Sequence, residues 1–282
     1  MLQHRTQQQQ RIITVFCLFH LADHIYNMNL FCQIATLLRE HNIKIHYYCP
    51  NQYHKQLRDF APPTENILEI RAMRDLDGDA IFDKGLAPGW FSPLLEMNIT
   101  NRKLPVNLYN RTHTNFDQLY EEFYEQFIRT YLPNAHPSCW MPTFICPARV
   151  DLIECYENLH ENFKDLDILF INPARTWDKF IIHTIKLGCK VAITTPIVRR
   201  TRARAYSHVI ETKIKTIAAI STHAKFVIAT TAAAETAACF NTYTMNYVNK
   251  MYIFDRQRRN ITFKHEKIAV FEEISNLFKE LH

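Results

Sequence analysis

Residues 11–28 read RIITVFCLFHLADHIYNM, and this stretch decides how the fold is interpreted. Residues 12–19 form an apolar run broken only by one threonine, which is typical of a strand buried on both faces of a parallel sheet. His20, Asp23 and His24 follow at once. Ligands of open α/β sheets bind where the chain leaves the carboxyl end of such a strand. The stretch therefore predicts an α/β fold with a polar site after its first strand.

Helix and strand signals alternate through the rest of the first half, by apolar periodicity and by the positions of Pro and Asn. The order of these segments predicts right-handed crossovers and a parallel sheet. Residues 71–114 have a weak pattern and are expected to form loops. The predicted elements are a helix over 25–40, a strand over 43–49, a helix over 53–60, a strand over 67–70 and a helix over 116–132.

The second half repeats the same alternation, after a stretch over 133–147 whose prolines are typical of a connector. Gly188 suits the left-handed cap of the helix before it. We expect a disordered polar leader over 1–10, an acceptor-binding α/β domain over 11–145, a nucleotide-sugar-binding α/β domain over 146–265 and a C-terminal helix over 266–282. The predicted elements are helices over 151–163, 177–187, 214–223, 231–240 and 268–281 and strands over 168–172, 190–194, 226–229 and 247–254.

Composition excludes several classes of site. The chain has only four glycines, and it lacks both the G-x-G-x-x-G fingerprint and the P-loop motif. Its eight cysteines show no C-x-x-C spacing, so no zinc site is predicted. The acidic run over 75–79 is more typical of a solvated turn than of a metal site. The apolar segment near the N-terminus is too short to span a bilayer, and no cleavage site follows it, so a cytoplasmic protein is expected.

The net charge of +5 is unevenly distributed, with one group of arginines over 199–204 and another over 256–259. Basic clusters favour anionic partners, either phosphate groups or nucleic acid. A solvated loop explains each cluster equally well. A protein that binds nucleotides or nucleic acid without catalysis is accordingly the competing hypothesis.

Polar or basic residues follow three strands predicted in the second half. Because the carboxyl ends of parallel strands meet at one edge of the sheet, these residues are expected to form a diphosphate site. Glu235 would accept hydrogen bonds from ribose hydroxyls. The alternative is that Thr231 caps a core helix and Glu235 only favours its dipole. The predicted donor-binding residues are Arg175, Thr194, Arg199, Arg200, Thr230, Thr231, Ala232, Ala233 and Glu235.

In the first half, Asp23 is the candidate general base, because a carboxylate at a strand end can take a proton from a sugar hydroxyl. The alternative is that Asp23 caps the helix that follows. His20 and His24 are candidates for acceptor binding. Trp90 could stack on a sugar ring, although packing is the commoner role of such a residue.

Two short segments carry a resemblance to a known family. Residues 21–26, Leu-Ala-Asp-His-Ile-Tyr, resemble the loop after the first strand of bacterial heptosyltransferases, with Ala22 in place of the family's glycine. Residues 226–238 resemble the strand and helix start that bind the donor diphosphate in that family. The resemblance implies a GT-B-like fold, in which two Rossmann-like domains with parallel sheets face each other across a cleft and a C-terminal helix packs back on the first domain. It assigns the catalytic base to Asp23.

Residues 19–24, 47–49, 218–221 and 252–255 also resemble the compact glycosyltransferase-like proteins of large DNA viruses that infect algae. This resemblance implies an enzyme that builds capsid glycans in the host cytoplasm. The implied donor is a nucleotide sugar, with a uridine diphosphate pentose such as xylose as the expected case. The implied acceptor is an oligosaccharide or glycoprotein. The expected reaction is an inverting transfer, without a cofactor, a metal or nucleic acid.

Overall fold

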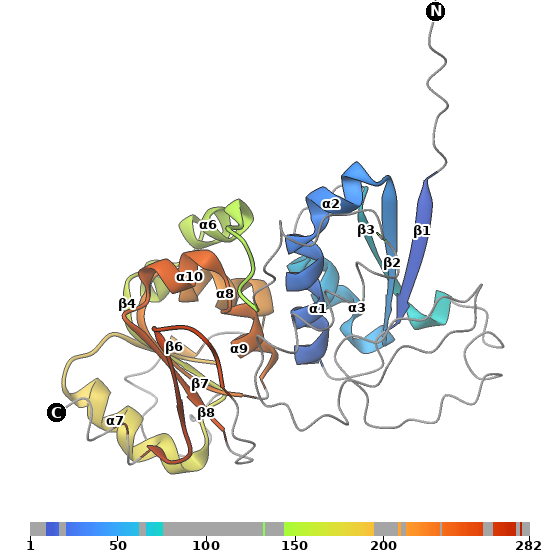
Figure 1. The fold of residues 1–282 in the computed structure, drawn as a ribbon. Helices are drawn as coiled ribbons and strands as arrows, with labels where there is room; N and C mark the ends of the chain where they lie inside the picture. Colours follow the sequence, from blue (N-terminus) through green and yellow to red (C-terminus); the bar gives the residue numbers. More distant parts are fainter. Residues whose placement is uncertain are drawn as a thin grey trace, which may run out of the picture. The chain divides into compact units, whose positions relative to one another are not determined.

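The computed structural model describes residues 10–16, 21–61, 66–75, 132, 144–194, 208–209, 213–231, 233–255, 262–274 and 277 (Figure 1). These residues fall into two compact units. Unit 1 contains the described residues 10–75 and 132, and unit 2 contains the described residues 144–277. The predicted domain limits stay predictions, and the predicted helix over 116–132 lies outside the described residues except for Leu132.

Unit 1 is built on a parallel sheet with the strand order β1-β2-β3. The register places Val15 opposite Tyr47, and Tyr47 opposite Ile70. The helices of unit 1 lie along this sheet (Figure 1). Its elements are β1 (Arg11–Phe16), α1 (Leu21–Gln33), α2 (Ala35–Glu40), β2 (Ile43–Cys49), α3 (Asn51–Phe60), β3 (Leu68–Ala72) and the 3-10 turn η1 (Met73–Asp75).

Unit 2 is built on a second parallel sheet, whose described strands have the order β6-β5-β4-β7-β8-β9. The chain runs outward from β4 through β5 to β6, then crosses to β7 and continues outward on the other side. The direction of winding therefore reverses between β4 and β7. The strands are β4 (Leu166–Ile171), β5 (Val191–Ile193), β6 (His208–Val209), β7 (Ala224–Thr230), β8 (Lys250–Phe254) and β9 (Ile268–Phe271).

The helices of unit 2 cover both faces of this sheet (Figure 1). Phe180 and Ile181 of α7 belong to one apolar core with Phe170 of β4 and Ile193 of β5, and each of these four residues is at most 2% exposed. Figure 1 places α8, α9 and α10 on the side of the sheet away from α7. The helical elements are α6 (Val150–Glu157), η4 (Glu161–Phe163), η5 (Arg175–Trp177), α7 (Asp178–Lys186), α8 (Ile214–Ser221), α9 (Ala234–Ala238) and α10 (Thr242–Tyr247).

Most predicted elements of the described residues are present, and the strand over 43–49 has the predicted limits. Gly188 has φ +85°, as a left-handed cap requires. Three helices differ from the prediction. The helix predicted over 25–40 begins at Leu21 and is interrupted at Ile34, and the one predicted over 151–163 ends at Glu157. The helix predicted from Thr231 begins only at Ala234.

The helix predicted over 268–281 was wrong for its first residues, although Ile274 and Leu277 are helical. Residues 268–271 form β9, not the start of a helix, because the free edge of β8 is available to them. Met251 donates its backbone N–H to Lys267 O at 2.8 Å, and Asp255 donates to Phe271 O at 2.9 Å. The β-branched Ile268 and Val270 suit this strand. No helix in the described part of the chain is long and apolar enough to cross a membrane.

Candidate functional site

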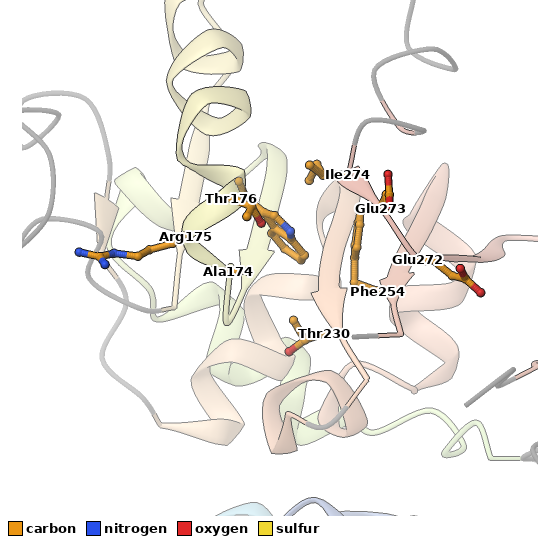
Figure 2. Close-up of a pocket in the computed structure, with 9 residues that line it drawn as sticks. Ala174, Arg175, Thr176, Thr230, Phe254, Glu272, Glu273 and Ile274 are labelled. Atoms are coloured by element: carbon orange, nitrogen blue, oxygen red, sulfur yellow. The ribbon is translucent and has the colours of Figure 1, made fainter. Parts of the chain in front are cut away.

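A pocket of about 440 Å³ opens at the carboxyl edge of the sheet of unit 2 (Figure 2). The lining residues are the last residues of β7 and β8 and parts of the segments that follow β4 and β9. The pocket includes the end of β7 and the segment after β4, so it lies at the point where the winding of the sheet reverses. Ligands of doubly wound sheets bind at this place. The lining residues are Ala174, Arg175, Thr176, Trp177, Thr230, Phe254, Glu272, Glu273 and Ile274.

Aromatic side chains form one wall of the pocket. The rings of Trp177 and Phe254 lie 4.5 Å apart between centroids, and both residues are almost fully buried. Phe271 packs on Phe254 with 6.1 Å between ring centroids. These residues belong to the apolar core under α7 or pack against it, so the wall is fixed by packing.

Charged side chains border the pocket. Arg175 is exposed, and in Figure 2 its side chain extends away from Phe254 and Ile274, so its guanidinium lies at the rim. Glu272 also points outward on the opposite side. The hydroxyl of Thr230 lies between these sides, beneath Phe254 in this view. An arginine and a hydroxyl beside an aromatic wall suit a ligand with an apolar ring and an anionic group that lies on the Arg175 side, away from Glu272 and Glu273.

Hydrogen bonds join the three strand ends that the sequence singled out. Asn172, directly after β4, donates its backbone N–H to Thr194 Oγ1 at 2.9 Å, directly after β5. Its side-chain Nδ2 donates to Glu235 Oε2 at 3.2 Å, in the first turn of α9. Thr194 is itself buried, and Thr194 N donates to Phe170 O at 3.0 Å. The structure thus brings Thr194 and Glu235 together around Asn172.

The segment between β7 and α9 differs from its prediction. Thr231 N donates to Phe254 O at 3.1 Å, which extends the strand pairing by one residue. Thr236 Oγ1 then donates to Thr230 O at 2.8 Å and closes the turn. The cap position is taken by Ala233 in extended conformation, so Thr231 does not cap the helix. Helix α9 is only five residues long, so its dipole is small.

In unit 1, Asp23 lies in the first turn of α1, not in the loop before the helix. The correction has a physical reason, because Leu21 and Ala22 are good helix formers and a carboxylate favours the positive end of the helix dipole. The side chain is half-buried. Asp23 thus remains near the carboxyl end of β1 in sequence, and its role as a base stays a prediction.

His24 was predicted to contact an acceptor, but its side chain is fully buried. Its Nδ1 lies 2.7 Å from the hydroxyl of Tyr47, and Asn27 Nδ2 donates to the same hydroxyl at 2.8 Å. Its ring also packs near Tyr53, with 5.5 Å between centroids. This environment favours a structural role, in which His24 ties α1 to β2.

Several predicted site residues lie outside the described part of the chain. These are His20, Trp90, Arg199, Arg200 and Ala232. The predicted arginine cluster over 256–259 lies there too. Among the described residues, no group of three His, Cys, Asp or Glu side chains could hold a metal ion.

The sequence reasoning missed four residues of this region. Trp177 and Phe254 were assigned only to a helix and a strand, because an aromatic residue in an apolar run looks the same whether it fills a core or lines a pocket. Glu272 was placed in a helix and so was not compared with strand ends. Asn172 is the last residue of the strand predicted over 168–172, and its position shortly before Arg175 was the available signal.

Solved structures share this fold. Escherichia coli heptosyltransferase WaaC, solved with ADP-2-deoxy-2-fluoro heptose, is 12% identical, with a TM-score of 0.54 over 96% of this chain and 98% of that one. The chain has a GT-B-like fold. A glycosyl transferase family 9 protein from Veillonella parvula is 12% identical, with a TM-score of 0.56 over 97% and 89% of the two chains.

The E. coli ADP-heptose LPS heptosyltransferase II is 11% identical, with a TM-score of 0.52 over 93% of this chain and 90% of that one. No protein-family model and no curated protein sequence matches the chain. At these identities the likeness concerns the fold. The α/β architecture with two parallel sheets, predicted from the alternation of strands and helices, is confirmed.

Proposed function

We propose that the protein is a glycosyltransferase that moves a sugar from a nucleoside diphosphate donor to a hydroxyl of a glycan acceptor. The observation that carries the proposal is the pocket at the reversal point of unit 2, which Arg175 and Thr230 both line. The fold supports it, since three similar structures with nearly full coverage are two heptosyltransferases and a family 9 glycosyl transferase.

The donor diphosphate is proposed to lie beside Arg175 and the end of β7. A guanidinium donates paired hydrogen bonds to phosphate oxygens, and the hydroxyls of Thr230 and Thr231 add neutral donors. Glu235 is proposed to accept hydrogen bonds from the ribose. The predicted contributions of Thr194, Arg199, Arg200, Ala232 and Ala233 belong to the same proposal.

The proposed reaction is a direct displacement at the anomeric carbon. A new bond forms between the acceptor oxygen and this carbon, while the bond to the donor's phosphate oxygen breaks. Asp23 accepts the proton of the acceptor hydroxyl, and the nucleoside diphosphate leaves with both electrons of the broken bond. Arginine side chains stabilise the charge that develops on the leaving group.

The finer identity of the substrates rests on resemblance alone. The proposal names a uridine diphosphate sugar, with xylose as the expected sugar, and a viral capsid glycan made in the host cytoplasm as acceptor. E. coli WaaC is solved with ADP and with ADP-2-deoxy-2-fluoro heptose, so adenosine diphosphate is the competing nucleotide. Independence of a metal ion belongs to the proposal as well.

The test is an assay of nucleoside diphosphate release from UDP-xylose, UDP-glucose and ADP-heptose, each with and without an oligosaccharide mixture as acceptor. The proposal expects release from at least one donor that rises when acceptor is present and persists with EDTA. Release of the nucleoside diphosphate at the same rate with and without acceptor would indicate a hydrolase. No release from any donor, with binding only to polynucleotide that weakens steeply with salt, would favour the nucleic-acid alternative.

A further inference from the structure

We infer that Asn172 is a positioning residue, which holds the carboxylate of Glu235 in place for the cis-diol of the donor's ribose. The inference rests on the proposed function, because it concerns Glu235, the carboxylate proposed above to accept hydrogen bonds from the donor's ribose. It goes beyond that function by naming the residue that fixes the ribose-binding group.

The geometry fixes Asn172 from two sides. Its backbone N–H donates to Thr194 Oγ1 at 2.9 Å, and Thr194 is only 1% exposed, so this anchor is part of the interior. Its side chain donates to Glu235 Oε2 at 3.2 Å. Asn172 therefore connects the ends of β4 and β5 to a side chain on α9, although Glu235 is 63 residues away along the chain.

The backbone conformation restricts which residue can make this connection. Asn172 has φ +47°, in the left-handed region that favours Gly, Asn and Asp. Glycine has no side chain to reach Glu235. Aspartate has only acceptor oxygens and would repel a carboxylate. Asparagine alone among the three combines the conformation with an N–H donor.

The hydrogen bond also determines what Glu235 offers a ligand. One carboxylate oxygen, Oε2, is engaged by Asn172. Within the described residues no hydrogen bond involves the other oxygen, Oε1, so it remains available as an acceptor. Two neighbouring hydroxyls donate well to one carboxylate, and a carboxylate already held in position loses less conformational freedom when they bind. The ligand chemistry that fits is the 2′,3′-diol of a ribonucleotide.

The experiment compares UDP and ADP with their 2′-deoxy forms by calorimetric titration of the full chain. Asn172→Gly keeps the left-handed backbone and the bond to Thr194 but removes the bond to Glu235. Asn172→Asp keeps the side-chain shape but places two carboxylates together. Asn66→Gly is the matched control, because Asn66 is also left-handed, with φ +65°, but lies in unit 1.

We expect the wild-type protein to prefer the ribonucleotide to its 2′-deoxy form. Asn172→Gly should weaken ribonucleotide binding about tenfold and leave 2′-deoxy binding unchanged, so that the preference disappears. Asn172→Asp should weaken ribonucleotide binding further, and Asn66→Gly should bind as wild type. Thermal denaturation of each variant measures whether it is folded.

Two negative results are distinguishable. If the wild-type protein binds the ribonucleotide but a folded Asn172→Gly keeps the same preference, this inference is overturned and the proposed function stands. If the wild-type protein binds neither UDP nor ADP, the proposed donor site is wrong and the inference falls with it. Should Asn172→Gly fail to fold, an unchanged preference in folded Asn172→Asp overturns the inference instead.

Discussion

The ring of Trp177 packs against the ring of Phe254 with 4.5 Å between centroids, at the place where the sheet of unit 2 changes its direction of winding. Both residues are almost fully buried, so the wall of the pocket is part of the core and needs no rearrangement to form. A preformed wall between Arg175 on one side and Glu272 and Glu273 on the other gives a ligand one rigid surface and charged contacts of both signs.

Replacing Arg175 by glutamine should weaken nucleoside diphosphate binding, because a hydrogen bond to a charged group is lost. The expected effect is about 1.5–3 kcal/mol, or roughly 10- to 150-fold in Kd. Calorimetric titration measures it. Lys186→Gln is the matched control, since Lys186 is an exposed cation at the far end of α7. Equal affinities of the two variants would show that Arg175 does not bind the donor diphosphate.

Replacing Asp23 by asparagine should abolish most transfer and leave donor binding intact, because the variant cannot accept a proton. General-base catalysis contributes on the order of 10²- to 10⁴-fold in rate, and the variant should lose that much in kcat. Asp59→Asn, an exposed carboxylate on α3 of the same unit, should behave as wild type. A folded Asp23→Asn protein with full transfer rate would show that Asp23 only favours the start of α1.

The hydroxyl of Tyr47 is expected to stabilise unit 1, because it is the common partner of buried His24 and Asn27. Tyr47→Phe removes that hydroxyl and leaves both side chains buried without it, which should cost about 1–3 kcal/mol in the free energy of unfolding. Urea denaturation measures the loss. Tyr53→Phe, on the half-buried ring beside His24, is the control with a smaller expected effect.

An ion pair at the start of α6 should make stability depend on pH. Arg149 donates two hydrogen bonds to the carboxylate of Asp151, at 3.1 and 2.8 Å, and Lys215 Nζ on α8 lies 3.0 Å from it. Burial by itself raises the pKa of Asp151, but the hydrogen bonds and charges of Arg149 and Lys215 outweigh burial and lower that pKa overall. Since Arg149 is buried, Asp151→Asn should cost about 3–5 kcal/mol at pH 7.

The sign of the pH effect follows from the lowered pKa. The stability from ionised Asp151 is fully present above its pKa in the unfolded chain, about 4, and is lost as the pH falls through its lower pKa in the folded protein. The difference between wild type and Asp151→Asn in urea denaturation should be constant above about pH 5 and shrink below about pH 4. Glu157→Gln, at the exposed end of α6, serves as the control. A difference that stays constant down to pH 2.5 would contradict the account.

The local signals of the sequence predicted much of the fold. The strand over 43–49 has its predicted limits because it alternates into a core and stops at Pro50. Gly188 ends its helix as predicted, since the left-handed cap is a local requirement. The predictions that failed concern residues whose structure depends on pairing partners far along the chain. The apolar pattern of residues 268–271 suits either a helix or a strand. These residues form a strand because they pair with the edge of β8.

The candidate site was predictable in part for the same reason. The order of strands and helices was enough to expect that the residues after β4, β5 and β7 share one edge of a sheet. The specific bond from Asn172 to Glu235 was not predictable, because it depends on the left-handed backbone at Asn172 and on α9 starting at Ala234. Likewise, the sequence does not distinguish Phe254, which lines the pocket, from the neighbouring Ile253, which lies in the core.

The most direct test of the central claim is calorimetric titration of the full chain with UDP, ADP and GDP at two salt concentrations. We expect at least one nucleoside diphosphate to bind with a stoichiometry of one per chain, and we expect Arg175→Gln to weaken this binding while Lys186→Gln does not. No heat of binding with any of the three, from a folded protein, would contradict that claim.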